Sequence, residues 1–285
     1  MPRTDGTLPA PPDNRPHLAN WHLTVAYDGG DYKGWQIQSN VPTVQGALFE
    51  ELRHLFPSPP ERMIGTSRTD AAVHALDQHL SFLAPSPDTL SPERVALILN
   101  RRLPKAIRVL HSERRDDDFD ARRSSVAKAY VYTLRRRAPC PPFEGRYVWD
   151  CSDPLDLPAV RTAAEELTGT RDFASFGVNP KRELDSTVRS LHRLDVVENG
   201  PYLHFVFLGD RFLYKMIRSI VGFLVDIGRK PGRARARVRA TLAACDRSAA
   251  PETAPPQGLC LVKVFFEQVP WAEYRPPLPP HRVEW

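Results

Sequence analysis

The order in which strand-like and helix-like apolar patterns follow one another constrains the fold of this chain most. In the first half, apolar residues alternate over 23–27, recur at helical spacing over 44–55, and alternate again after residue 78. Thr43 precedes the helical stretch and can accept a hydrogen bond from its first turn. A β–α–β order of this kind is typical of an α/β unit.

The second half repeats this order without repeating the sequence. Apolar residues alternate over 130–134 and 203–207, and a helical pattern lies between them at 160–167. Another helical pattern runs from about Arg211 to Ile227, and a last strand is expected near Leu259 to Phe265. The sequence therefore predicts an α+β fold with two α/β halves that share an extended antiparallel sheet.

The distribution of proline along the chain indicates where its tails and its two halves begin and end. The chain has 29 prolines among 285 residues, about twice the usual frequency. We expect a loosely ordered Pro-rich tail at 1–20, an N-terminal half at 21–115, a C-terminal half at 116–268 and a second Pro-rich tail at 269–285. Inside the first half, Ser91-Pro92 has the order of a helix N-cap followed by a first-turn proline.

Composition excludes several classes of protein. An apolar content of 41% with 26% charged residues is typical of a soluble globular protein, and no apolar run is long enough to span a bilayer. No secretory signal is recognised, so a cytoplasmic location is expected. The cysteines form no C-x-x-C pair and no zinc spacing with histidine, which favours free thiols: they are Cys140, Cys151, Cys245 and Cys260.

Basic residues are clustered, although the net charge of +5 is modest. One cluster spans 101–105, a second spans 135–137, and a third contains six arginines and lysines within 229–239. Each cluster could be a solvated helix face or a set of contacts to RNA phosphates. The candidates for RNA binding are Arg101, Lys105, Arg233, Arg235 and Arg237.

The segment Thr66–Ala75 has the features of a site. It places Arg68 and Asp70 two residues apart on a short loop between two extended stretches. An isolated R-T-D tripeptide would be interpreted as an ordinary surface ion pair. Arg218 raises a similar question, because it lies within a helical pattern that is apolar nearly all round and must either reach solvent or pair with an acid such as Asp226.

Several motifs together resemble one known family. The loop reads R-T-D-x-x-V-H-A and is similar to the signature loop of the tRNA pseudouridine synthase A family. Further segments match motifs of that family in the same order along residues 22 to 266: Tyr27–Gln36, Thr43–Gly46, Leu99–Pro104, Phe119–Arg122, Lys128–Tyr132, Asp172–Phe176, Phe212–Gly222 and Gln257–Leu259.

The resemblance implies two ferredoxin-like halves with an active cleft between them. It implies isomerisation of uridine to pseudouridine in the anticodon arm of tRNA, at positions 38–40, by a homodimer that uses no cofactor or metal. Asp70 matches the essential catalytic residue, Tyr130 the tyrosine that stacks on the target base, and Arg218 the arginine that pairs with the aspartate. Arg68 is the candidate for filling the space that the base vacates, whereas His74 is given no catalytic role.

Two departures from the family pattern lie beside the catalytic aspartate. Ser67 and Ala72 stand where the family usually has glycine, and they would be strained if those positions require positive φ. Two alternatives therefore stay open. One is a non-catalytic RNA-binding relative or tRNA-folding factor, and the other is a pseudouridine synthase with different target sites.

Overall fold

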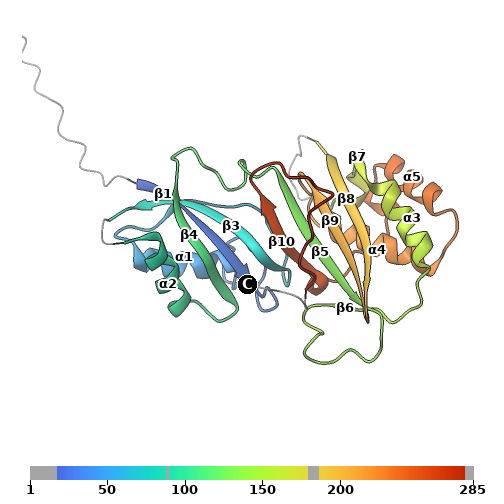
Figure 1. Cartoon of the computed structure of the whole chain (residues 1–285), viewed down its shortest axis with the longest axis horizontal. Helices are drawn as coiled ribbons and strands as arrows, with labels where there is room; N and C mark the ends of the chain where they lie inside the picture. The colour runs from blue at the N-terminus through green and yellow to red at the C-terminus, as the bar shows by residue number, and fades with distance from the viewer. Residues whose placement is uncertain (1–17, 88–89, 179–185, 280–285) are drawn as a thin grey trace, which may run out of the picture.

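The computed structural model describes residues 18–87, 90–178 and 186–279, and in this part of the chain one mixed, mostly antiparallel sheet of ten strands runs through both halves (Figure 1). The first half contains, in chain order, β1 (Leu18–Tyr27), α1 (Val44–Leu55), β2 (Glu61–Gly65), β3 (His74–Pro85), α2 (Pro92–Arg102) and β4 (Ile107–Arg115). The strand order here is β4-β1-β3, with β2 also paired to β3, which is a ferredoxin-like arrangement.

The second half has the same arrangement with additions. Its elements are β5 (Ala127–Arg135), β6 (Trp149–Asp150), α3 (Leu157–Leu167), β7 (Gly169–Asp172), a 3-10 turn (Ala174–Phe176), β8 (Val188–Asn199), β9 (Tyr202–Gly209), α4 (Met216–Arg229), α5 (Ala234–Ala244), two further 3-10 turns (Arg247–Ala249 and Pro256–Gly258) and β10 (Leu259–Phe265). The strand order is β10-β5-β9-β8-β7. The predicted α+β fold with a shared sheet is confirmed.

β10, the last strand, joins the two halves. It pairs parallel with the start of β3 at His74 and Ala75, and antiparallel with β5 from Tyr132 to Ala127. Farther along β3, the same edge is paired with β2 instead, at Leu80 to Leu83. The loop between β2 and β3 leaves the sheet where the β2 ladder ends, which places it against the junction between the halves.

Local signals in the sequence explain the helix starts. Thr43 accepts a hydrogen bond from the N–H of Gly46 at the start of α1, and Ser91 accepts one from the N–H of Arg94 at the start of α2. The predicted start at Arg211 is wrong, because α4 begins at Met216. Lys215 has φ 60°, a left-handed conformation that separates residues 211–214 from the helix.

The two faces of the sheet are covered differently. The main core contains apolar residues of α1 to α4 packed on one face. A smaller core on the other face contains Ala127, Ala129 and Val131, and residues of the C-terminal segment pack on it. The Trp271 ring stacks on His192 with ring centroids 5.5 Å apart.

Both predicted tails need correction where the structure describes them. Residues 18–20 belong to β1, and residues 1–17 lie outside the described part. The segment 269–279 is not loose: Arg193 Nη1 donates to the carbonyl oxygen of Tyr274 at 2.8 Å, and the hydroxyl of Thr133 donates to that of Pro279 at 2.8 Å. Residues 280–285 lie outside the described part.

Two properties of the described residues concern membranes and metal ions. None of their helices combines the length and the apolar character that a membrane span requires. They also contain no group of three or more histidine, cysteine or acidic side chains arranged to hold a metal ion. The four cysteines are free thiols.

Candidate active site

Buried polar side chains form hydrogen bonds to the loop that carries Asp70. Gln78 on β3 is fully buried, and its side-chain amide accepts from the N–H of Ser67 at 3.2 Å and donates to the Ser67 carbonyl at 2.7 Å. The hydroxyls of Tyr27 and Thr69 share a hydrogen bond of 2.7 Å. These hydrogen bonds hold the chain on both sides of Arg68, so the loop has a defined conformation.

The two departures from the family pattern differ in their backbone. Ala72 has φ 61°, the left-handed conformation that glycine adopts at low cost, whereas Ser67 is not among the residues with positive φ. The expected strain is therefore present at Ala72 alone. Gly34 also has a positive φ of 97°, and a Cβ there would lie 2.7 Å from the Thr69 carbonyl oxygen, so glycine lets the loop approach this closely.

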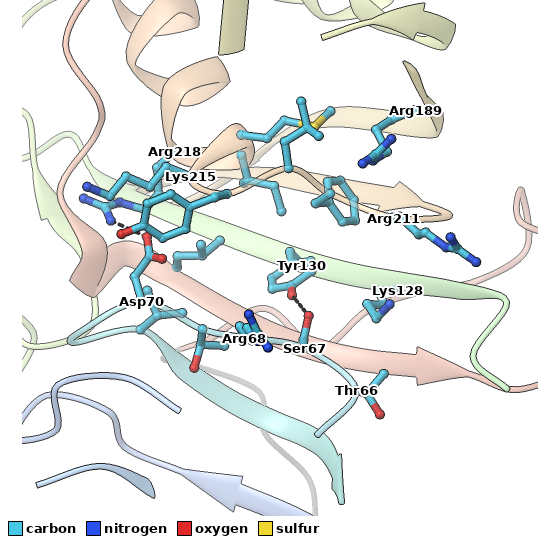
Figure 2. Close-up of a pocket in the computed structure, with 18 of the residues that line it drawn as sticks. Thr66, Ser67, Arg68, Asp70, Lys128, Tyr130, Arg189, Arg211, Lys215 and Arg218 are labelled. Atoms are coloured by element: carbon cyan, nitrogen blue, oxygen red, sulfur yellow. Dashed lines mark hydrogen bonds and ion pairs between the residues drawn. The ribbon is translucent and has the colours of Figure 1, made fainter. Parts of the chain in front are cut away.

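Asp70 lines a pocket of about 430 Å³ between the loop and the start of α4 (Figure 2). Asp70 and Arg218 lie at one end of this pocket and Lys128 and Arg211 at the other, with Tyr130 between them. The remaining lining comes from Thr66, Ser67, Arg68, Thr69, Val73, Arg122, Arg123, Arg189, Phe212, Leu213, Tyr214, Lys215, Met216, Ile217 and Leu259.

Arg218 and Asp70 form an ion pair across the junction of the two halves. Nη1 of Arg218 lies 2.5 Å from Oδ2 of Asp70, and each side chain is only 12% exposed. Nε of Arg218 donates to the carbonyl of Ala254 at 2.9 Å, so the guanidinium is fixed at two points. Gly222 allows this contact, because a Cβ there would lie 2.1 Å from the Glu252 carbonyl oxygen.

This pair settles the question that Arg218 raised in the sequence. The arginine neither extends freely into solvent nor pairs with Asp226, which binds Lys230 and Arg237 instead. Among the described residues, Oδ1 of Asp70 accepts no hydrogen bond. The arginine therefore orients the carboxylate and occupies one of its oxygens, while the other oxygen stays available to a ligand.

Tyr130 lies on β5 and contacts the same loop. Its hydroxyl shares a 2.6 Å hydrogen bond with that of Ser67, and its ring meets Phe212 edge to face at 5.3 Å. Burial raises the pKa of Tyr130 to about 12, so the phenol stays protonated near neutral pH. Tyr132 is fully buried, and its hydroxyl donates to the carbonyl of Pro255 at 2.7 Å, which is a packing role.

The structure brings together some of the predicted site residues and separates the others. Asp70, Tyr130, Arg218 and Arg68 all line the pocket. Five further candidates lie elsewhere, at the end of α2 or around α5: Arg101, Lys105, Arg233, Arg235 and Arg237. Lys105 lines a separate, smaller pocket with His74, whose Nδ1 lies 3.1 Å from Oδ1 of Asp28.

Sequence reasoning missed most of the basic wall of the pocket. Arg122 and Lys128 stand inside motifs that match the family, but these motifs alone indicate no role for them. The helical pattern predicts that Arg211 and Lys215 lie in a helix, whereas they lie on the loop that precedes it. Arg189 stands at the start of β8 without any motif. Only the fold brings these scattered cations to one pocket.

The pocket can hold an anionic ligand with a flat ring. Its cations attract negative charge, Tyr130 and Phe212 offer aromatic surface, and Asp70 supplies a single oriented carboxylate. Histidine and cysteine are absent from its lining, so the donor set does not suit a transition metal.

Comparisons with known proteins show which family the chain resembles in sequence. Residues 163–267 match the family model described as tRNA pseudouridine synthase. The chain is 38% identical over 251 residues to tRNA pseudouridine synthase A 1 of Protochlamydia amoebophila, which covers 87% of this chain and 96% of the relative. It is 39% identical over 243 residues to tRNA pseudouridine synthase A of Geobacillus kaustophilus, covering 85% and 93%.

Proposed function

Because the chain belongs to the tRNA pseudouridine synthase A family, we propose that it isomerises uridine to pseudouridine in the anticodon arm of tRNA, at positions 38–40. The observation that carries the proposal is the ion pair between Asp70 and Arg218 inside a pocket with basic walls. A protein that only bound RNA phosphates would not need a carboxylate at this position.

The reaction breaks the bond between uracil N1 and the ribose, turns the base, and joins its C5 to the same sugar carbon. Atoms and electrons balance without a redox partner, because C5 loses the proton that N1 gains. Asp70 could attack the sugar, attack the base or remove a sugar proton, and each of these roles requires an ionised carboxylate with a free oxygen. The contact of Arg218 with Oδ2 fixes the direction of the carboxylate, and Oδ1 accepts no hydrogen bond from a described residue.

Two further residues of the pocket receive roles in the proposal. The buried ring of Tyr130 provides a surface on which the uracil can stack, and its protonated hydroxyl can donate a hydrogen bond. The target base must first leave its stack in the RNA. Arg68 is exposed on the same loop as Asp70, which suits it to enter the space that the base vacates.

The remaining parts of the proposal concern partners and location. We propose that the enzyme acts as a homodimer in the cytoplasm, with the two subunits holding one tRNA. Basic residues outside the pocket would bind tRNA phosphates and position the anticodon arm; these are Arg101, Lys105, Arg233, Arg235 and Arg237.

The test of the proposed activity is Asp70→Asn. This change keeps the shape of the side chain but removes the charge, so it should abolish pseudouridine formation while the affinity for tRNA stays within a few-fold. Pseudouridine at each tRNA position is measured after incubation with purified enzyme. Asp31→Asn is the matched control, because Asp31 is 74% exposed and lies outside the pocket.

Three outcomes would contradict the proposal. Substantial turnover by Asp70→Asn would remove Asp70 from its role. Binding of tRNA without any turnover by the unmodified protein would identify a non-catalytic RNA-binding relative. Modification outside the anticodon arm would identify a synthase with different target sites.

A further inference from the structure

We propose that Lys128, together with Arg122 and Arg211, forms an anion subsite that binds one phosphate group of the RNA backbone beside the target nucleotide. The inference rests on the proposed function, since it names the part of the substrate that this end of the pocket recognises. Lys128 and Tyr130 are two positions apart on β5 and therefore project from the same face of the strand, about 7 Å apart. This spacing suits a phosphate beside a base that lies on Tyr130.

Lys128 is a buried cation without a counter-ion. Lys128 is only 6% exposed, and it forms no hydrogen bond and no ion pair with another described side chain. Lysine is almost never buried to this extent unless it is paired. A structural lysine would be expected to have an acceptor, whereas this side chain lines a pocket that can admit one.

Most of the charge around Lys128 has the same sign as its own. Arg211 and Arg122 lie near it and repel its ammonium group, whereas the acid Asp210 attracts it. Asp210 is itself engaged, because its Oδ1 accepts the backbone N–H groups of Ser190 and Arg211. Arg122 donates Nε and Nη2 to the Gly65 carbonyl, which fixes its guanidinium beside the pocket. The local field is therefore positive and suits an anion.

The titration of Lys128 agrees with this geometry. Burial and the charges of Arg211 and Arg122 lower its pKa to about 8, and Asp210 acts in the opposite direction. A phosphate bound at this position would reverse the effect of the two arginines and favour the ammonium form. The unliganded protein thus carries an electrostatic cost that binding of the anion would relieve.

The test compares Lys128→Met with Lys263→Met. Lys263 is a lysine on the neighbouring strand β10, lies outside the pocket and is 45% exposed beside Asp77. The dissociation constant for tRNA is measured at several salt concentrations. Lys128→Met should raise this constant roughly tenfold or more, and the slope of its logarithm against that of salt should fall by about 0.7 to 0.9. Lys263→Met should change neither quantity.

Two additional readouts separate binding from packing. Removing an unpaired buried cation should leave the melting temperature of Lys128→Met equal or higher. The affinity of the unmodified protein should weaken between pH 7 and pH 8.5, as Lys128 loses its proton. Lys128→Arg should retain its affinity over this range, because arginine stays charged. This variant also keeps the test decisive if the methionine variant fails to fold.

Several results would overturn the inference. An unchanged dissociation constant and salt slope in a well-folded Lys128→Met would do so, as would a lower melting temperature with unchanged affinity. If inorganic phosphate stabilises the unmodified protein but not Lys128→Met while tRNA affinity is unaffected, the subsite binds free phosphate and not the RNA backbone. Failure of the proposed function would be distinct, since it would appear as a Lys128-dependent tRNA affinity without pseudouridine formation.

Discussion

Arg218 forms a buried ion pair at a position where packing alone would favour an apolar side chain. It stands on α4, the most apolar of the described helices, in which eleven residues are buried. It contacts Asp70 and the Ala254 carbonyl through different nitrogens. Replacing a buried ion pair by apolar residues is often neutral for stability. The pair is therefore better explained by the orientation that it gives to the carboxylate.

We expect Arg218→Lys to lower the rate of pseudouridine formation by about 10-fold to 100-fold, because lysine keeps the charge but cannot hold both contacts. Arg218→Met should be slower still, since Asp70 loses its partner. The measurement is the single-turnover rate at saturating tRNA, with a melting curve for each variant. Near-normal rates in Arg218→Met would contradict the assigned role.

Ala72 is a second residue whose effect on the free energy of unfolding can be measured. Its φ of 61° is unfavourable for any residue with a Cβ. Ala72→Gly should therefore raise the free energy of unfolding by about 0.5 to 1 kcal/mol, whereas Ser67→Gly, at a position without positive φ, should lower it. Chemical unfolding of the three proteins checks this. A stabilising Ser67→Gly or a destabilising Ala72→Gly would show that φ is not the deciding factor.

At the scale of elements, the arginines on and next to α5 differ in how far their charge is available to RNA phosphates. In Figure 1 this helix lies at the end of the molecule farthest from α1 and α2. Arg237 lies 2.5 Å from Asp226 of α4, Arg235 pairs with Glu165 of α3, and Arg239 pairs with Glu166. Arg233, in contrast, is exposed and has no ion pair with a described residue.

This difference predicts that Arg233 contributes mainly to tRNA binding and Arg237 mainly to stability. Arg233→Gln should reduce the salt dependence of tRNA binding, because its charge is available to a phosphate. Arg237→Gln should have less effect on binding, and it should lower the free energy of unfolding by about 0.5 to 1 kcal/mol through loss of the pair with Asp226. Salt titrations and unfolding curves of both variants test this. Equal salt slopes for the two variants and the unmodified protein would identify the run as a solvated face.

At the scale of the whole molecule, a line of titratable side chains crosses four strands of the sheet. His22 on β1 lies 2.8 Å from Glu113 on β4 and 2.8 Å from His79 on β3. The line continues through Asp77 to Lys263 on β10, with His79 Nε2 at 3.2 Å and Lys263 Nζ at 3.2 Å from Oδ2 of Asp77. It therefore connects the first half to the strand that joins both halves.

This line should make the stability of the whole sheet depend on pH. Burial lowers the pKa of His22 from 6.5 to about 4, with the charge of His79 acting in the same direction and Glu113 against it. Between these values the unfolded chain binds more protons than the folded one, so stability falls as the pH drops from about 6.5 to 4. The loss due to His22 should be about 1 to 3 kcal/mol.

Unfolding by urea at pH 7, 5.5 and 4.5 measures the effect. His22→Gln should flatten the dependence, because glutamine does not titrate. His54→Gln, at an exposed position on α1, is the control and should follow the unmodified protein. A His22→Gln protein with the same loss of stability over this range would exclude His22 as its source.

The sequence by itself determined the elements and the central loop. Strand alternation, helical spacing and the caps Thr43 and Ser91 depend on neighbouring residues, so they can be recognised without the fold. The position of Asp70 between two strands followed in the same way. The start of α4 could not be predicted, because the apolar pattern continues through residues 212–213 while the backbone of Lys215 is left-handed.

Only the tertiary structure decided which residues share the site. Asp70 and Arg218 are 148 positions apart, and they meet because β10 brings the two halves into one sheet. The isolation of Lys128 and the pairing of the arginines on α5 likewise depend on which charges packing places nearby. Burial and Coulomb interactions act through space, so residues with the same local pattern can become the partner of a carboxylate in a pocket, an unpaired cation or a surface ion pair.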